Sequence, residues 1–282
     1  MTLQNALIIL GALALVIVVG GYAGMQLFYG SIYKFDQTAT DPETSGLPGL
    51  REVTFTSEDG AEVSAWIRPP QENLPVILYF MGNFTSIGPS VGRLAPFLEA
   101  GYGLAALVYR GSSGKGGAPG EEVFAGDARA LYDQLDTLIG APVPPDRRIA
   151  YGYSLGSGVA VRLAAERDVA VVALEAAYAR FCDYFTDRYH GLPFCRVMTR
   201  ERYDSIDRIT RINAPLILFH GEKDDAISIA SARRLFDAAA EPKEFHAFAD
   251  GTHVNLGDKG LYPLALAFFA AHIPAAGSAI KQ

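Results

Sequence analysis

The stretch "RRIAYGYSLGSGVAVRLAAE", residues 147–166, places Ser154 between two glycines at the junction of two sequence patterns. The residues before the serine form a short apolar run, and those after it repeat apolar residues at helical spacing. A G-x-S-x-G motif between a strand and a helix is typical of a nucleophile elbow, whose sharp turn requires glycine at 152 and 156 and exposes the hydroxyl. We therefore predict that Ser154 is a nucleophile. Gly158 is expected to let the helix approach the sheet.

The same alternation of patterns extends along most of the chain. Continuous apolar runs, bounded by turns, occur at residues 75–82, 103–110, 147–152, 169–175 and 215–221, with a further strand at 243–249. Stretches with helical spacing separate these runs, and a last helix is expected from about 259 to 272. Continuous apolar runs indicate strands buried on both faces. The sequence therefore predicts an α/β fold with a mostly parallel, doubly wound sheet.

Three segments fall outside this alternation. Residues 51–69 alternate apolar and polar side chains around "SEDG", which predicts an antiparallel hairpin at the start of the sheet. Residues 178–212 interrupt the pattern and are expected to form a small cap insertion. Residues 36–50, rich in Pro, Gly, Thr and Asp, are interpreted as a linker. The catalytic domain is thus expected at 51–273, followed by a tail at 274–282.

The N-terminal residues 1–35 form a separate segment. From Ala6 to Gly30 they contain no ionisable side chain other than tyrosine. A helix of roughly 20 such residues crosses the hydrocarbon core of a bilayer, so we predict a single-pass membrane anchor. A cleaved secretory signal is the alternative, although no Lys or Arg precedes the apolar run. Too few charges flank the segment to indicate which side of the membrane carries the domain.

Composition argues against nucleic acid as a partner and leaves open whether the two cysteines form a disulfide. The formal net charge is −7, and no basic stripe is present to bind phosphates, so nucleic acid is not expected as a partner. Cys182 and Cys195 are the only cysteines. Either a disulfide or two reduced thiols fits their spacing. No metal-ligand pattern is present, and neither a metal nor a cofactor is expected. Asp127 and Asp204 are interpreted as helix-associated charges or caps.

A serine nucleophile needs a base, and the five histidines of the chain offer one good candidate. His253 lies in the polar loop "ADGTHVN", directly after the last predicted strand. Such a loop brings an imidazole to the carboxyl edge of the sheet, where open α/β proteins hold their sites. We therefore predict His253 as the base.

Three carboxylates are candidates for the group that orients this histidine. Asp224 and Asp225 follow the strand at 215–221, and Glu175 ends the strand before it. One of the two aspartates is expected to cap the following helix. The order Ser154, Asp224, His253 is the order expected of a catalytic triad in this type of fold, which favours Asp224.

Acyl transfer also needs donors for the oxyanion that develops on the substrate. The loop "FMGNFTSIG", residues 80–88, follows the first parallel strand and is expected to supply a backbone N–H from Asn83 or Phe84, with Asn83 preferred. The second donor is expected to be the N–H of Leu155, next to the nucleophile. A plain turn at Gly82 is the alternative.

These motifs together resemble those of the serine α/β-hydrolases. The resemblance lies in "GYSLG", "HGEKDDAI" and "GTH" in this order, with "YRGSSGKGGAPGEE" between the second and third parallel strands and "RYDSIDRI" before the acid-bearing strand. It is strongest for the membrane-anchored, single-span branch that includes protein depalmitoylases and related esterases, and it runs from about residue 51 to 272. The resemblance implies an α/β-hydrolase fold with Ser154 as nucleophile, Asp224 as acid and His253 as base.

Two positions depart from the family pattern. The family commonly has histidine where this chain has Met81, and it tends to have aspartate where this chain has Val108. Because the oxyanion donor next to Met81 is a backbone group, we expect activity to survive the first departure.

The expected function is that of a membrane-anchored serine hydrolase which cleaves carboxylic esters or thioesters through an acyl-enzyme. Its expected substrate is a small acyl ester or thioester, with lipid-linked acyl groups included. Two alternatives remain at this point: a serine peptidase of the same fold, and a non-catalytic binding protein built on it.

Overall fold

The structure of the protein, a computed structural model, describes residues 2–72 and 74–274. The chain divides into two compact units, residues 1–34 and 35–282. The tail predicted at 274–282 lies, apart from its first residue, outside the described residues.

The N-terminal unit is dominated by one long helix, α1 (Leu3–Gly30). At 1.5 Å per residue its 28 residues extend about 42 Å, more than the hydrocarbon core of a bilayer. Within the described part of the chain it is the one helix long and apolar enough to cross a membrane. A signal sequence meets the same criteria, so the helix by itself supports either an anchor or a signal.

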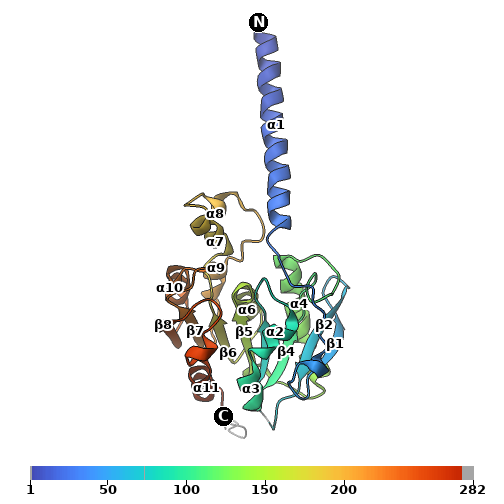
Figure 1. Cartoon of the computed structure of the whole chain (residues 1–282), viewed down its shortest axis with the longest axis vertical. Helices are drawn as coiled ribbons and strands as arrows, with labels where there is room; N and C mark the ends of the chain where they lie inside the picture. The colour runs from blue at the N-terminus through green and yellow to red at the C-terminus, as the bar shows by residue number, and fades with distance from the viewer. Residues whose placement is uncertain (1, 73, 275–282) are drawn as a thin grey trace. The chain divides into compact units, whose positions relative to one another are not determined.

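The second unit is built on an eight-stranded sheet of order β1-β2-β4-β3-β5-β6-β7-β8 (Figure 1). The strands are β1 (Arg51–Thr56), β2 (Glu62–Arg68), β3 (Val76–Phe80), β4 (Gly103–Leu107), β5 (Arg148–Tyr153), β6 (Val171–Glu175), β7 (Leu216–Gly221) and β8 (Lys243–Phe248). The β1–β2 and β2–β4 pairs are antiparallel, and all others are parallel. The predicted hairpin and mostly parallel sheet are confirmed.

Helices pack on both faces of the sheet. They are α2 (Ile87–Gly92), α3 (Ala95–Glu99), α4 (Glu121–Asp133), α5 (Leu135–Ile139), α6 (Leu155–Glu166), α7 (Phe181–Arg188), α8 (Phe194–Val197), α9 (Ser205–Ile209), α10 (Ile229–Ala238) and α11 (Leu261–His272). Short 3-10 turns occur at Pro42–Thr44, Pro145–Arg147 and Gly257–Lys259. Helix α6 contacts α4 and α9, and α9 contacts α10, while α3 contacts α11. The helices therefore form two groups around the buried strands, as a doubly wound sheet requires.

The residues expected to act as a linker pack on the domain. Just before them, the ring of Phe35, the last residue of the predicted anchor segment, lies 5.6 Å from that of Tyr109 and 6.0 Å from that of Phe124. The Gln37 side chain donates to the carbonyl of Gly111 over 2.6 Å. The start of the predicted linker is therefore held to the domain by a polar contact, and the residue before it by apolar contacts.

The segment between β6 and β7 carries α7, α8 and α9. Figure 1 shows α7 and α8 together at one end of this unit. A disulfide joins Cys182 of α7 to Cys195 of α8, with 5.0 Å between their Cα atoms. Of the two possibilities left open by the sequence, the structure has the disulfide.

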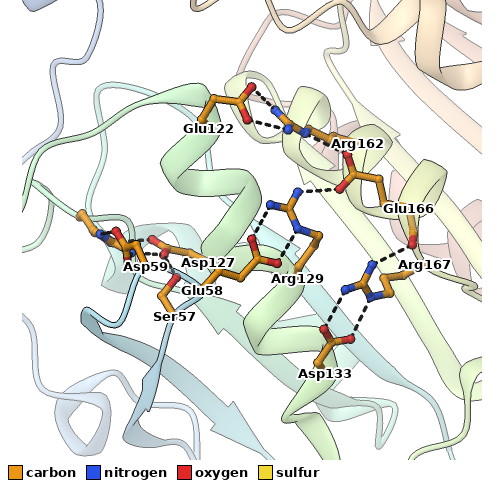
Figure 2. Close-up of polar contacts among 11 residues, drawn as sticks. Ser57, Glu58, Asp59, Glu122, Asp127, Arg129, Asp133, Arg162, Glu166 and Arg167 are labelled. Carbon is orange, nitrogen blue, oxygen red and sulfur yellow. Dashed lines mark hydrogen bonds and ion pairs between the residues drawn. The ribbon is translucent and has the colours of Figure 1, made fainter.

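Of the two interpretations of Asp127, a charge within a helix or a helix cap, the structure agrees with the first. Asp127 lies in the middle of α4 and is fully buried, so it caps no helix. Its carboxylate accepts a hydrogen bond from the Ser57 hydroxyl at 2.5 Å (Figure 2). It also accepts from the Arg110 guanidinium. The pattern of one helix could not indicate this role, because both partners come from distant segments.

Candidate active site

The turn between β5 and α6 holds Ser154 in an unusual backbone conformation, with φ 51° and ψ −117°. Its N–H donates to the carbonyl of Glu175 over 2.9 Å. A Cβ at residue 156 would collide with the Phe80 carbonyl, and one at residue 152 would collide with the backbone of residue 156. The turn can therefore form only with glycine at these two positions, as expected for a strained nucleophile elbow.

Gly158 serves a different contact from the one expected. A Cβ there would collide with the Tyr178 hydroxyl and lie 2.8 Å from Cδ1 of Tyr203. This glycine therefore lets α6 approach the aromatic side chains at the base of the insertion, rather than the sheet. The expectation was wrong because the spacing of small residues does not identify the neighbouring element.

The structure brings the predicted nucleophile, base and acid together. The hydroxyl oxygen of Ser154 lies 2.9 Å from Nε2 of His253, and Nδ1 of His253 lies 2.8 Å from Oδ2 of Asp224. With Nδ1 protonated, the imidazole donates to the carboxylate and accepts from the serine hydroxyl. Residues separated by 99 and 29 positions thus form a continuous hydrogen-bonded chain at the carboxyl edge of the sheet.

Asp224 also organises the turn in which it lies. Its second carboxylate oxygen accepts from the N–H groups of Ala226 at 2.9 Å and Ile227 at 2.8 Å. Burial opposes its ionisation, but the hydrogen bond and charge of His253 hold the pKa of Asp224 below its ordinary value. The expected helix cap was wrong: α10 has Ser228 at its N-cap position, and Asp225 is exposed.

A second histidine lies behind this carboxylate. His220, at the end of β7, is fully buried, and its Nε2 lies 2.9 Å from the Ile227 carbonyl and 3.5 Å from the Asp224 carboxylate. Burial lowers the pKa of His220, which favours a neutral ring donating to the carbonyl. The sequence placed His220 at the end of a buried strand without indicating this contact.

The loop expected to supply an oxyanion donor passes beside the nucleophile. A Cβ added at Gly82 would lie 3.3 Å from the Cβ of Ser154. The N–H of Phe84 donates to the side-chain oxygen of Asn83 over 3.1 Å, which engages the alternative donor. Leu155 is the first residue of α6, so its N–H lies at the positive end of the helix dipole.

Glu175, the third candidate for the acid, does not contact His253. Its carboxylate accepts from the Tyr151 hydroxyl at 2.9 Å and from the Arg93 guanidinium. Sequence patterns could not reveal these partners, since they lie 24 and 82 positions away.

Several curated proteins are similar to this chain. Protein Rv2307c of Mycobacterium tuberculosis is 34% identical over 206 residues, which is 72% of each protein. The lysophosphatidylserine lipase ABHD12 of Danio rerio is 26% identical over 243 residues, or 73% of this chain and 63% of the lipase. The human α/β hydrolase domain-containing protein 17B is 28% identical over 194 residues, or 68% of this chain and 65% of that protein.

The fold is shared with solved enzymes. The Pyrococcus furiosus esterase Pf2001 superposes with a TM-score of 0.68 at 17% identity, covering 86% of this chain and all of the esterase. No protein-family model matches the chain. The match to this esterase covers most of the chain, so the α/β-hydrolase fold is shared over most of its length.

Proposed function

Because this chain is an enzyme of the serine α/β-hydrolase superfamily, we propose that it cleaves carboxylic esters or thioesters through an acyl-enzyme on Ser154. The observation that carries the proposal is the position of the His253 ring, 2.9 Å from the serine hydroxyl and 2.8 Å from the Asp224 carboxylate. These are the distances needed for a proton to pass from an attacking alcohol to a base.

In the first step, the Ser154 oxygen forms a bond to the substrate carbonyl carbon while its proton moves to Nε2 of His253. Asp224 stabilises the imidazolium through Nδ1. The tetrahedral intermediate collapses as the C–O or C–S bond to the leaving group breaks, and the imidazolium returns the proton to that group. Water then attacks the acyl-enzyme with the same histidine as base, which releases the acid and restores the serine.

The oxyanion of the intermediate is assigned to two backbone donors, the N–H groups of Asn83 and Leu155. Support comes from the closeness of the Gly82 backbone to the nucleophile and from the place of Leu155 at the start of α6. A backbone donor is independent of the side chain at residue 81, so methionine is compatible with this role.

Esters are the favoured substrates because the similar proteins include a lipase and an esterase by name. A lipid-linked acyl group fits a domain attached to an apolar helix. A panel of p-nitrophenyl esters and acyl thioesters of increasing chain length, with matched amides, measures this preference.

The N-terminal helix is proposed to anchor the domain in a membrane, with the domain on the oxidising side. The bond between Cys182 and Cys195 supports this orientation, because disulfides persist in oxidising compartments and are rare in the cytosol.

The Ser154→Ala variant tests the proposed chemistry. We expect it to lose p-nitrophenyl ester turnover and covalent labelling by a fluorophosphonate probe, while it stays folded as judged by thermal unfolding. Labelling at the wild-type rate in this variant would defeat the assignment of the nucleophile.

A further inference from the structure

Four polar side chains next to the histidine loop, three of them buried and one a quarter exposed, take no part in the proton transfers described above. Arg93, Tyr151, Tyr153 and Glu175 contact one another and are here called the Arg93 cluster. Arg93 follows α2, the tyrosines belong to β5, and the glutamate ends β6. Three elements of the fold therefore meet in it.

Two members of the cluster bind the backbone of the loop that carries the proposed base. The Tyr153 hydroxyl donates to the carbonyl of His253 over 3.1 Å. The Arg93 guanidinium donates to the next carbonyl, that of Val254, over 3.0 Å. Two successive peptide groups of the loop are thus fixed by donors from two different elements.

The arginine is itself held on two sides. Its guanidinium lies 4.2 Å from the centroid of the Tyr153 ring and donates to Glu175, whose other carboxylate oxygen accepts from Tyr151 at 2.9 Å. Burial acts to lower the pKa of Arg93, but the facing Glu175 carboxylate keeps it above its ordinary value, so the group stays charged. Burial likewise raises the pKa of Tyr153, which keeps its hydroxyl a donor.

The same cluster contacts the nucleophile turn. The backbone carbonyl of Glu175 accepts from the N–H of Ser154 over 2.9 Å, and Tyr153 directly precedes that serine. The nucleophile turn and the histidine loop therefore share one support, although 99 positions separate the two residues.

We propose that Arg93 and Tyr153 are positioning residues, which hold the His253 loop in register with Ser154 by binding its two carbonyls. The inference rests on the proposed function. Reaction rates depend steeply on the separation of reacting groups, and a displacement of about 1 Å can cost about 100-fold. Loss of one of two loop contacts should therefore slow the chemical step while substrate binding is retained.

The Tyr153→Phe variant tests this directly, since it keeps the ring that stacks on Arg93 and removes only the hydroxyl. We expect kcat and the rate of fluorophosphonate labelling to fall about tenfold, with KM changed by less than about twofold. Backbone amides of residues 249–256 should exchange hydrogen faster, while Tm changes by less than about 2 °C.

Tyr132 provides the matched control. Its hydroxyl donates to the carbonyl of Asp168. This residue lies in the loop before β6, at the amino ends of the parallel strands, whereas the proposed site lies at their carboxyl ends. Tyr132→Phe makes the same chemical change at a loop carbonyl far from the site, and we expect wild-type kcat.

Arg93→Lys and Arg93→Met extend the test. Lysine keeps a cation beside Glu175 but lacks the planar fork that reaches two acceptors, so Arg93→Lys should retain more kcat than Arg93→Met. If Arg93→Met does not fold, Tyr153→Phe and Arg93→Lys decide the question.

The outcomes separate the two proposals. Wild-type protein that is not labelled overturns the proposed function and this inference with it. Labelled wild type together with unchanged kcat in Tyr153→Phe overturns the inference alone. An equal loss of kcat in Tyr132→Phe also overturns it, because the effect would then be a general consequence of losing a buried hydroxyl.

Discussion

The two oxygens of one carboxylate connect the proposed base to the backbone. Oδ1 of Asp224 binds the N–H groups of Ala226 and Ile227, and Oδ2 binds His253. The side chain of Asp224 is fully buried, whereas that of His253 is 18% exposed. The imidazole thus receives its orientation from a buried carboxylate while its other nitrogen faces the Ser154 hydroxyl.

Replacement of Asp224 by asparagine should remove this orientation with little change in shape. The amide can donate to Nδ1, which favours the tautomer that carries its proton on Nε2 and cannot accept from the serine. We expect kcat/KM for a short ester to fall by about 10³–10⁴-fold. Steady-state turnover, with thermal unfolding to check folding, measures the effect.

Asp225→Asn is the matched control for that change, because this neighbouring carboxylate is exposed and lies outside the hydrogen-bonded chain. Its kcat/KM should stay within about twofold of wild type. A large loss of kcat/KM in Asp225→Asn with little loss in Asp224→Asn would show that Asp225, not Asp224, is the acid.

At the scale of elements, arginines join the helix that begins at the nucleophile to its neighbour. Arg162 of α6 binds Glu122 of α4 in two hydrogen bonds of 2.7 Å (Figure 2). Arg129 of α4 binds both Glu166 of α6 and Glu58 in the β1–β2 turn. These pairs join the C-terminal half of α6 to α4 and to the β1–β2 turn.

The Arg129→Met variant tests how much these ion pairs contribute to the free energy of unfolding. The Arg129 hydrogen bond lowers the pKa of Glu58 from 4.5, so its contribution to stability is present above that pH and is lost as pH falls through the folded-state pKa. The variant should be about 1 kcal/mol less stable at pH 7. This difference should shrink below pH 4, as measured by urea unfolding across a pH series.

Lys223→Met is the control, since its pair with Asp250 is exposed on both sides and should be worth little. A deficit for Arg129→Met that stays constant from pH 7 to about pH 3 would show that packing, not charge, joins the helices.

The sequence predicted these elements well where local pattern determines them. Strands such as β3 and β7 are buried on both faces and therefore appear as continuous apolar runs. The nucleophile elbow has its own local pattern of glycines. The candidate triad could be proposed in the same way, because each member lies in the segment after a strand and strand ends meet at one edge of the sheet.

What the sequence could not provide are contacts between distant side chains. Arg93 follows a short helix and has no pattern of its own, yet it binds Val254 and Glu175. Asp127 seemed an ordinary helical charge and is buried against Ser57. Such pairs depend on three-dimensional proximity, which neither hydrophobic periodicity nor residue spacing records.

At the scale of the whole molecule, an apolar helix and a hydrolase domain occupy separate units of one chain. The charges near the helix do not determine its direction, because Lys34 is the one basic residue close to it. The disulfide between Cys182 and Cys195 provides the missing argument, since it needs an oxidising compartment. With one spanning helix, this orientation leaves the N terminus in the cytoplasm, whereas the opposite orientation would place both cysteines there.

Reporter fusions to the C terminus of the full chain in a bacterial host test this orientation. Alkaline phosphatase should be active, because its own disulfides form only outside the cytoplasm, and green fluorescent protein at the same position should be dark. Cys182 and Cys195 should resist alkylation until a reductant is added. A fluorescent fusion whose cysteines are alkylated without reductant would show that the domain lies in the cytoplasm, which contradicts the proposed orientation. The disulfide would then be absent from the protein in the cell.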